Sequence, residues 1–160
     1  MTGRIRIILT LTTVVLALGC FTFEQSTPAQ SESSYCKQVK GNLIVEFGPG
    51  TASGAITNGS FLNGTVETVF TPGSVAATAD PTSVTFTGDS AITTDKGVIT
   101  THDLYLFDFA TELGSGMLRI DPAASTGDFA GATGIIYLNI NAGDPPGHAR
   151  LGGRICFASE

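Results

Sequence analysis

The sequence predicts an all-β protein that folds as a single closed antiparallel barrel of about eight strands. Short runs of strand-forming residues recur along the chain, and turns rich in glycine, proline and asparagine separate them. No long segment has the periodicity of a helix. A β-sandwich is the alternative, because it has the same rhythm of strands and turns. We favour the barrel because closure removes exposed sheet edges.

The N-terminus resembles a secretory signal. Two arginines precede an apolar run at residues 7–19, which is shorter than the about 20 residues that span a membrane. We expect residues 1–29 to be a signal and leader, cleaved after Ala29. The alternative is a lipoprotein signal that ends before Cys20, which would then carry the lipid. The protein is therefore expected to be secreted or periplasmic, or else lipid-anchored at the cell envelope, with no transmembrane span in the mature chain.

The remaining chain is expected to contain a flexible N-terminal segment, residues 30–41, and one barrel domain, residues 42–160. Both processing routes remove Cys20 from the free thiols, which leaves Cys36 and Cys156 near the two ends of the core. In an oxidising compartment these two cysteines are expected to form a disulfide between the first and last strands.

Composition and motifs exclude several kinds of function. The formal net charge is −6, so we expect no nucleic-acid partner, which would need clustered Lys and Arg. The two histidines are too few for a three-histidine metal site, and no phosphate-loop motif is present. We expect no metal and no cofactor. Asn58 and Asn63 each begin an Asn-Gly turn and a glycosylation sequon. Whether they carry glycans, and whether the protein is a homo-oligomer, is left open.

Residues 127–134 read Gly-Asp-Phe-Ala-Gly-Ala-Thr-Gly and precede a run of strand formers. Gly127, Gly131 and Gly134 predict a tight bend that leads into a strand, since glycine tolerates positive φ and close backbone approach. Phe129 is the one large side chain in the bend, and we expect it to be buried beneath it. The bend is interpreted as a structural corner of the barrel.

This motif resembles the G-x-F-x-G-A-x-G signature of barrels similar to plant allene oxide cyclases and dirigent proteins. Secreted bacterial proteins of unassigned function carry similar barrels. A looser match in strand and turn rhythm runs from Asn42 to Phe157. The motif is structural, so the resemblance implies the fold. None of the family's catalytic residues matches position by position, and none is carried over.

A small barrel can hold one ligand in its lumen or mouth, so the candidate ligand-binding residues are polar or aromatic residues within strands. Alternation assigns Tyr105 and Tyr137 to inward faces, and each offers an apolar body with one hydroxyl. Asn139 shares the face of Tyr137. Glu67 is the fourth candidate, and it would serve as a general acid if it were buried beside the tyrosines.

Alternation also places Asp103 on the inward face and His102 on the opposite face, so these neighbours cannot form a catalytic dyad. The leading function is an exported barrel that binds a small, largely apolar molecule, without assigned catalysis. One alternative is an enzyme similar to allene oxide cyclases or dirigent proteins, which would steer cyclisation or coupling of a reactive intermediate. The other is a structural or surface-interaction protein with a packed lumen. An open apolar cavity of a few hundred Å³ would favour the first two over the third, and a carboxylate in that cavity would favour the enzyme.

Overall fold

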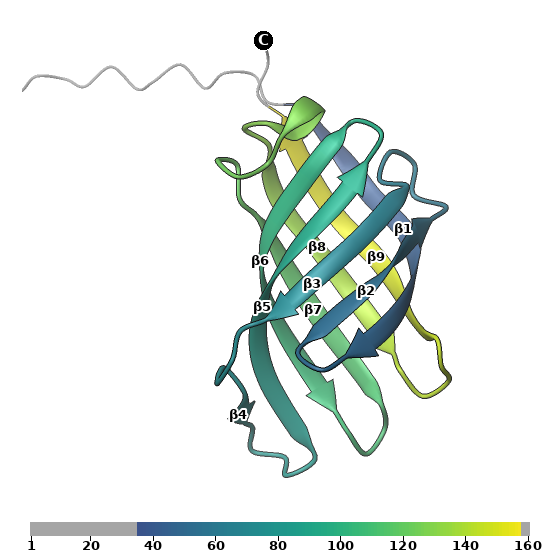
Figure 1. Ribbon diagram of the computed structural model, residues 1–160, viewed down its shortest axis with the longest axis vertical. Coiled ribbons are helices and arrows are strands. Elements are labelled where there is room, and N and C mark those ends of the chain that lie inside the picture. The colour runs from purple at the N-terminus through teal and green to yellow at the C-terminus, as the bar shows by residue number, and fades with distance from the viewer. Residues whose placement is uncertain (1–34, 158–160) are drawn as a thin grey trace, which may run out of the picture. The chain divides into compact units, whose positions relative to one another are not determined.

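The computed structural model describes residues 35–157. Eight antiparallel strands form a closed barrel, and one short extra strand lies beside it (Figure 1), which confirms the predicted fold. A single 3₁₀ turn, η1 (Gly127–Phe129), interrupts the β structure. The strands are β1 (Tyr35–Gly48), β2 (Thr51–Thr57), β3 (Gly64–Phe70), β4 (Ala76–Ala77), β5 (Ser83–Thr94), β6 (Gly97–Asp108), β7 (Leu113–Ile120), β8 (Thr133–Asn141) and β9 (Gly147–Phe157).

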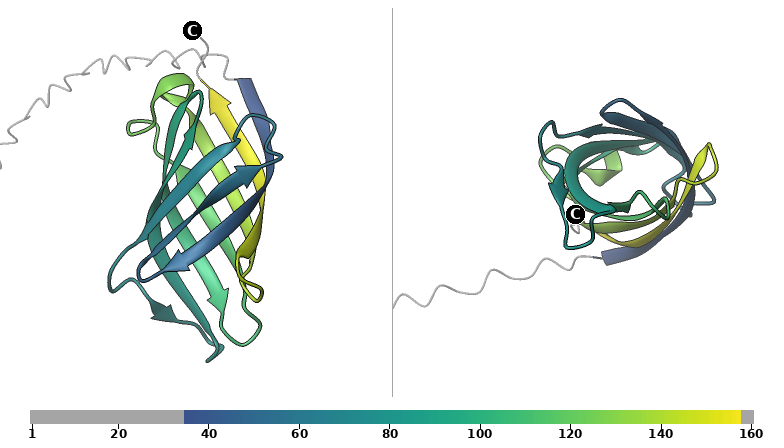
Figure 2. Two further views of the ribbon diagram at one scale, coloured as in Figure 1. Left: turned by 45° about the vertical axis from the view of Figure 1, so that its right-hand side comes forward. Right: turned by 90° about the horizontal axis from the view of Figure 1, so that it is seen from below.

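The ring closes through pairings between strands that follow one another along the chain. β1, β2 and β3 pair in sequence, β3 pairs with β5, and the series continues to β9, which pairs with β1. The view along the barrel in Figure 2 shows this ring. Every strand of the ring has a partner on both sides, which excludes the sandwich alternative. β4 pairs only with β5. Within residues 35–157, no helix is long and apolar enough to cross a membrane.

Side chains along each strand alternate between an inner and an outer face, as the pleat of a β-strand requires. The inner face is mostly apolar, and its burial is the main favourable term in folding. On β1, Leu43 and Val45 are buried, whereas Ile44 and Glu46 between and after them are exposed. The other fully apolar core positions follow the same rule, among them Val66, Ile92, Ile99, Leu118, Ile136, Leu138, Leu151 and Ile155.

The barrel begins earlier than the sequence predicted. Residues 35–41 were expected to be flexible, but they form the first half of β1 and pair with β9. Val39 is the one buried side chain among them, so their polar composition concealed the strand. The predicted signal segment, residues 1–29, and Cys20 lie outside the described residues.

Cys36 and Cys156 face each other in the β1–β9 pairing and form a disulfide, as predicted. The bond joins the first strand of the barrel to the last. It is compatible with an oxidising compartment outside the cytoplasm.

The two ends of the barrel differ. The end at the top of Figure 1 carries the disulfide, the β2–β3 loop and η1, and we call it the closed end. Phe129 and Leu62 fill it, each with 1% of its surface exposed, and Phe129 lies 6.1 Å from Phe157 between ring centroids. The opposite end, the mouth, carries the β1–β2, β6–β7 and β8–β9 connections and the long segment that contains β4.

The glycine-rich stretch forms a bend that docks against the β5–β6 hairpin at the closed end. Gly127 has a φ of 63°, and a Cβ atom there would lie 2.2 Å from the carbonyl oxygen of Lys96. The amide of Asp128 donates to that same oxygen over 2.9 Å. Gly131 and Gly134 also have positive φ, 72° and 145°. Glycine is therefore required where the bend meets the hairpin.

The two Asn-Gly sites do not form separate hairpin turns. Asn58 and Asn63 both lie in the single loop between β2 and β3. Asn58 has a φ of 54°, and Asn63 Oδ1 accepts a hydrogen bond of 2.9 Å from the amide of Gly59. The asparagine side chain thus stabilises the loop that covers the closed end.

Candidate functional site

Five buried polar side chains meet on the inner wall of the barrel, and we call them the luminal cluster. They are Thr68 from β3, Ser90 from β5, and Thr101, Asp103 and Tyr105 from β6. Each has 6% or less of its surface exposed. Alternation on β6 turns its three members to the same side, and strand register places Thr68 directly opposite Ser90 and Ser90 opposite Thr101.

The carboxylate of Asp103 is the centre of this cluster. Tyr105 Oη donates to Oδ2 over 2.8 Å, and Thr101 Oγ1 donates to Oδ1 over 2.6 Å. Ser90 Oγ also donates to Oδ2. A further bond of 2.7 Å joins Ser90 Oγ and Thr68 Oγ1. The buried carboxylate is therefore held by three hydroxyl donors.

Burial shifts the pKa values of both titratable members of the cluster. Loss of hydration raises the pKa of Asp103 above its ordinary value, and the hydrogen bonds from Ser90, Thr101 and Tyr105 oppose this effect. Desolvation, reinforced by the negative charge of Asp103, raises the pKa of Tyr105. The tyrosine hydroxyl therefore keeps its proton at every physiological pH.

A cavity of about 50 Å³ lies inside the barrel beside the cluster. That volume holds only a few water molecules, at about 10–15 Å³ each, so the lumen is largely filled. Its polar lining comes from Thr68, Ser90 and Tyr105. The rest is apolar and includes Leu43, Val45, Ala52, Ile56, Val66, Ile92, Leu118, Leu138, Ile140, Ala149 and Leu151.

The mouth opens into a second, wholly apolar cavity of about 300 Å³. Four phenylalanines line both cavities, which are therefore adjacent, namely Phe47, Phe70, Phe86 and Phe107. Phe109 and Ala142 complete the lining of the cavity at the mouth. The ring of Tyr105 stacks on Phe86 with centroids 5.2 Å apart. The hydroxyl of Tyr105 lies among the polar groups of the luminal cluster, and its ring packs against the phenylalanines.

The predicted site residues separate in the structure. Tyr105 lies in the lumen with 5% of its surface exposed. Tyr137 and Asn139 point outward, because Ile136 and Leu138 occupy the inner positions of β8. The assignment of these two residues to the lumen was wrong by one residue of register.

Glu67 was also wrongly assigned to the site. It points outward, because its neighbours Val66 and Thr68 are the buried residues of β3. No ligand-binding role in the lumen is open to this carboxylate. The carboxylate that the lumen does contain is Asp103.

Sequence reasoning missed four members of the luminal cluster. Asp103 had a usable signal, since alternation placed it on the same face as Tyr105. Thr68, Ser90 and Thr101 had none, because threonine and serine also occur on the outer face of this barrel, as Ser53 and Thr65 do. They become recognisable only when the β3–β5–β6 register brings them together.

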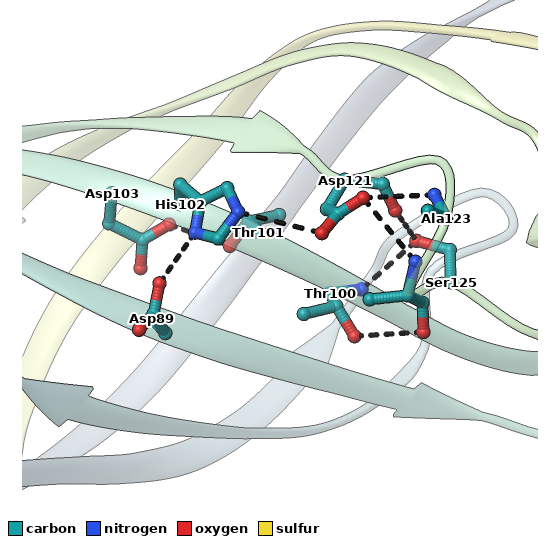
Figure 3. Close-up of polar contacts among 9 residues, drawn as sticks. Asp89, Thr100, Thr101, His102, Asp103, Asp121, Ala123 and Ser125 are labelled. Atoms are coloured by element: carbon teal, nitrogen blue, oxygen red, sulfur yellow. Dashed lines mark hydrogen bonds and ion pairs between the residues drawn. The ribbon is translucent and has the colours of Figure 1, made fainter.

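The outer face carries a separate polar network around His102 (Figure 3). His102 Nδ1 lies 2.7 Å from Asp89 Oδ1, and Nε2 lies 3.5 Å from Asp121 Oδ2. The hydrogen bond to Asp89 raises the pKa of His102. Two-thirds of the histidine side chain is exposed, at 67%, and exposed ion pairs contribute little to stability. In the part of the chain that the structure describes, no three His, Cys, Asp or Glu side chains gather as metal ligands.

Comparison of the chain with models of known protein families, with curated proteins and with solved structures finds no match. The resemblance of residues 127–134 to allene oxide cyclases and dirigent proteins therefore stays a prediction. The site must be interpreted from its own geometry.

Proposed function

We propose that this protein is an exported barrel that binds a small, largely apolar molecule. The observation that carries the proposal is the apolar cavity at the mouth, which lies next to the luminal cavity because the same four phenylalanines line both. Ligand sites are typically apolar clefts with a few convergent polar groups. The volume of the cavity at the mouth is at the lower end of the usual range of about 300–1,000 Å³ for such sites.

The two cavities limit what the ligand can be. Aromatic walls at the mouth favour an apolar, flat or short-chain body, which would be removed from water by Phe86, Phe107 and Phe109. The narrow lumen admits only a small group beyond them. The ligand would therefore be one ring, two fused rings or a short chain, with one polar group reaching Tyr105.

The test is binding of ethylbenzene, naphthalene and octane to the oxidised protein, followed by ligand-observed NMR. We expect at least one of them to bind, and Ala142→Phe to abolish binding because the new ring would fill the mouth. Ala123→Phe is the matched control, since Ala123 is exposed at the closed end and its substitution should leave binding unchanged. If none of the three compounds binds the unmodified barrel, the packed, structural alternative becomes the better account.

A second candidate function is an enzyme similar to allene oxide cyclases or dirigent proteins. The observation that favours it is Asp103, a buried carboxyl with a raised pKa that contacts Tyr105, a residue of the luminal cavity lining. Such a group suits proton transfer to a reactive intermediate held away from water. The test is one-electron oxidation of a simple 4-alkenylphenol in the presence of the protein. An enantiomeric excess in the coupled product that Asp103→Asn removes would support the enzyme, and a racemic product would count against it.

A further inference from the structure

The hydroxyl protons of the luminal cluster are all directed toward the carboxylate of Asp103 or toward a hydroxyl that is bonded to it. When Asp103 is ionised it can only accept, so Tyr105, Ser90 and Thr101 each donate their single hydroxyl proton to its carboxylate. Three donors converging on one carboxylate satisfy its ionised form. None of these protons is left to point elsewhere.

The direction of the remaining bond follows from this count. Ser90 has given its only proton to Asp103, so in the 2.7 Å bond between Ser90 and Thr68 the donor must be Thr68. Thr68, Ser90 and Tyr105 line the cavity, whereas the lining does not include Asp103 or Thr101. The cluster residues that line the cavity therefore have oxygen lone pairs, and no unengaged proton, to offer a ligand.

We propose that the lumen selects apolar molecules that carry a hydrogen-bond donor, such as an alcohol or a phenol, over molecules of the same shape that carry only an acceptor, such as a ketone or an aldehyde. The inference rests on the proposed binding function and names its ligand class. A ligand hydroxyl would find acceptor oxygens on Tyr105, Ser90 or Thr68. A ligand carbonyl would lose its hydrogen bonds to water and find no donor in the lumen.

The cluster cannot easily adapt to a carbonyl. For Tyr105 or Ser90 to donate to the ligand, it would have to withdraw its proton from Asp103 and leave a buried charge with one donor fewer, which is costly. For Thr68 to donate, it would have to give up its 2.7 Å bond to Ser90. Backbone amides offer no substitute, since those of β3, β5 and β6 are paired with neighbouring strands along the lumen. Within residues 35–157, every buried side-chain nitrogen and oxygen already has a partner.

Three compounds with one carbon skeleton test the inference, namely 1-phenylethanol, acetophenone and ethylbenzene. Their dissociation constants are measured by NMR titration of the oxidised protein at pH 7. We expect 1-phenylethanol to bind at least about tenfold more tightly than acetophenone, because an unsatisfied buried carbonyl has a large cost. Ethylbenzene reports binding that involves no polar group.

Variants locate the preference within the cluster. Thr68→Val and Tyr105→Phe keep the side-chain shape but remove an acceptor, and each should reduce the ratio of the two dissociation constants. Thr65→Val is the matched control, since Thr65 is an exposed threonine on the same strand and its substitution should leave the ratio unchanged. The wild-type ratio stands as a test even if a cluster variant fails to fold.

The outcomes separate the inference from the function on which it rests. If acetophenone binds as tightly as 1-phenylethanol, or more tightly, the donor preference is wrong while the binding function stands. If ethylbenzene and both polar compounds fail to bind, the binding function itself fails. If Thr65→Val reduces the preference for 1-phenylethanol as much as Thr68→Val does, the preference does not come from the luminal cluster, and the inference is also overturned.

Discussion

The disulfide between Cys36 and Cys156 spans 120 residues of sequence, and as a covalent cross-link it also constrains the unfolded chain. We expect replacement of both cysteines by serine to lower the free energy of unfolding. For a closed loop of this length the chain-entropy relation gives a loss of about 16 cal/mol/K, or about 5 kcal/mol at 25 °C.

Little of that loss should come from the folded state. Cys36 is exposed and Cys156 is half-buried, so serine at either position removes little packing. The β1–β9 pairing remains, and Tyr35 still stacks on Phe157 with ring centroids 5.2 Å apart. The barrel should therefore fold without the bond, with a far-UV circular dichroism spectrum like that of the wild type.

The assay is equilibrium unfolding in urea, followed by far-UV circular dichroism because the chain contains no tryptophan. With a denaturant slope of about 2 kcal/mol/M, the midpoint should fall by about 2–3 M. The reduced wild-type protein should unfold at the same midpoint as the double serine variant. A decrease of less than about 1 kcal/mol in the free energy of unfolding would refute the reasoning, since it would mean that the unfolded chain has little more conformational freedom without the disulfide than with it.

The remaining predictions also concern stability, and urea unfolding measures each of them. Gly134→Ala should destabilise by well over the about 1 kcal/mol typical of point substitutions, because its Cβ would lie 2.1 Å from the carbonyl oxygen of Arg154; a neutral result would contradict the geometry of the bend. Gly131→Val should cost about 1–3 kcal/mol through backbone strain alone, since its φ is 72° and the space around it is open. Phe129→Ala should cost about 3–5 kcal/mol, and a smaller loss would show that the closed end can collapse onto the gap. Asp103 has a pKa raised above its unfolded value of 3.8, so its protonated form favours the folded state at low pH, and that contribution is lost as the pH rises through the folded pKa. Relative to Asp103→Asn, the wild type should therefore lose stability above about pH 4. A stability difference between the two proteins that stays constant with pH would contradict the shift.

The fold could be predicted because its determinants are local. Strand runs, turn residues and the position of two cysteines each act over short distances or at the chain ends, and together they indicate a ring of strands. The start of β1 could not be predicted, because residues 35–41 contribute one buried side chain, Val39, and are stabilised mainly by backbone pairing with β9. Pairing of this kind leaves no pattern in composition.

The candidate site could be predicted only where one face of a strand was clearly more apolar. On β6, the face of Tyr105 and Phe107 could be distinguished from the face of His102, so the inward side was assigned correctly. On β8, apolar residues occupy both faces, with Ile135 and Tyr137 alternating against Ile136, and the alternation gave no decision. An error of one residue in the assignment of faces then placed Tyr137 and Asn139 inside the barrel, although both point outward.

The luminal cluster bears on why this lumen should be a binding site at all. A barrel selected only for stability would gain from apolar residues at these positions, because replacement of buried charged groups by well-packed apolar ones is often neutral or stabilising. Here a carboxylate, a tyrosine and three smaller hydroxyl side chains are buried together, and three of these residues line a cavity next to an aromatic mouth. The cost of burying Asp103 is offset by donors that fix every hydroxyl proton in one direction. A fixed array of acceptors beside an apolar cavity is what recognition of a single donor group requires, and packing alone would not call for it.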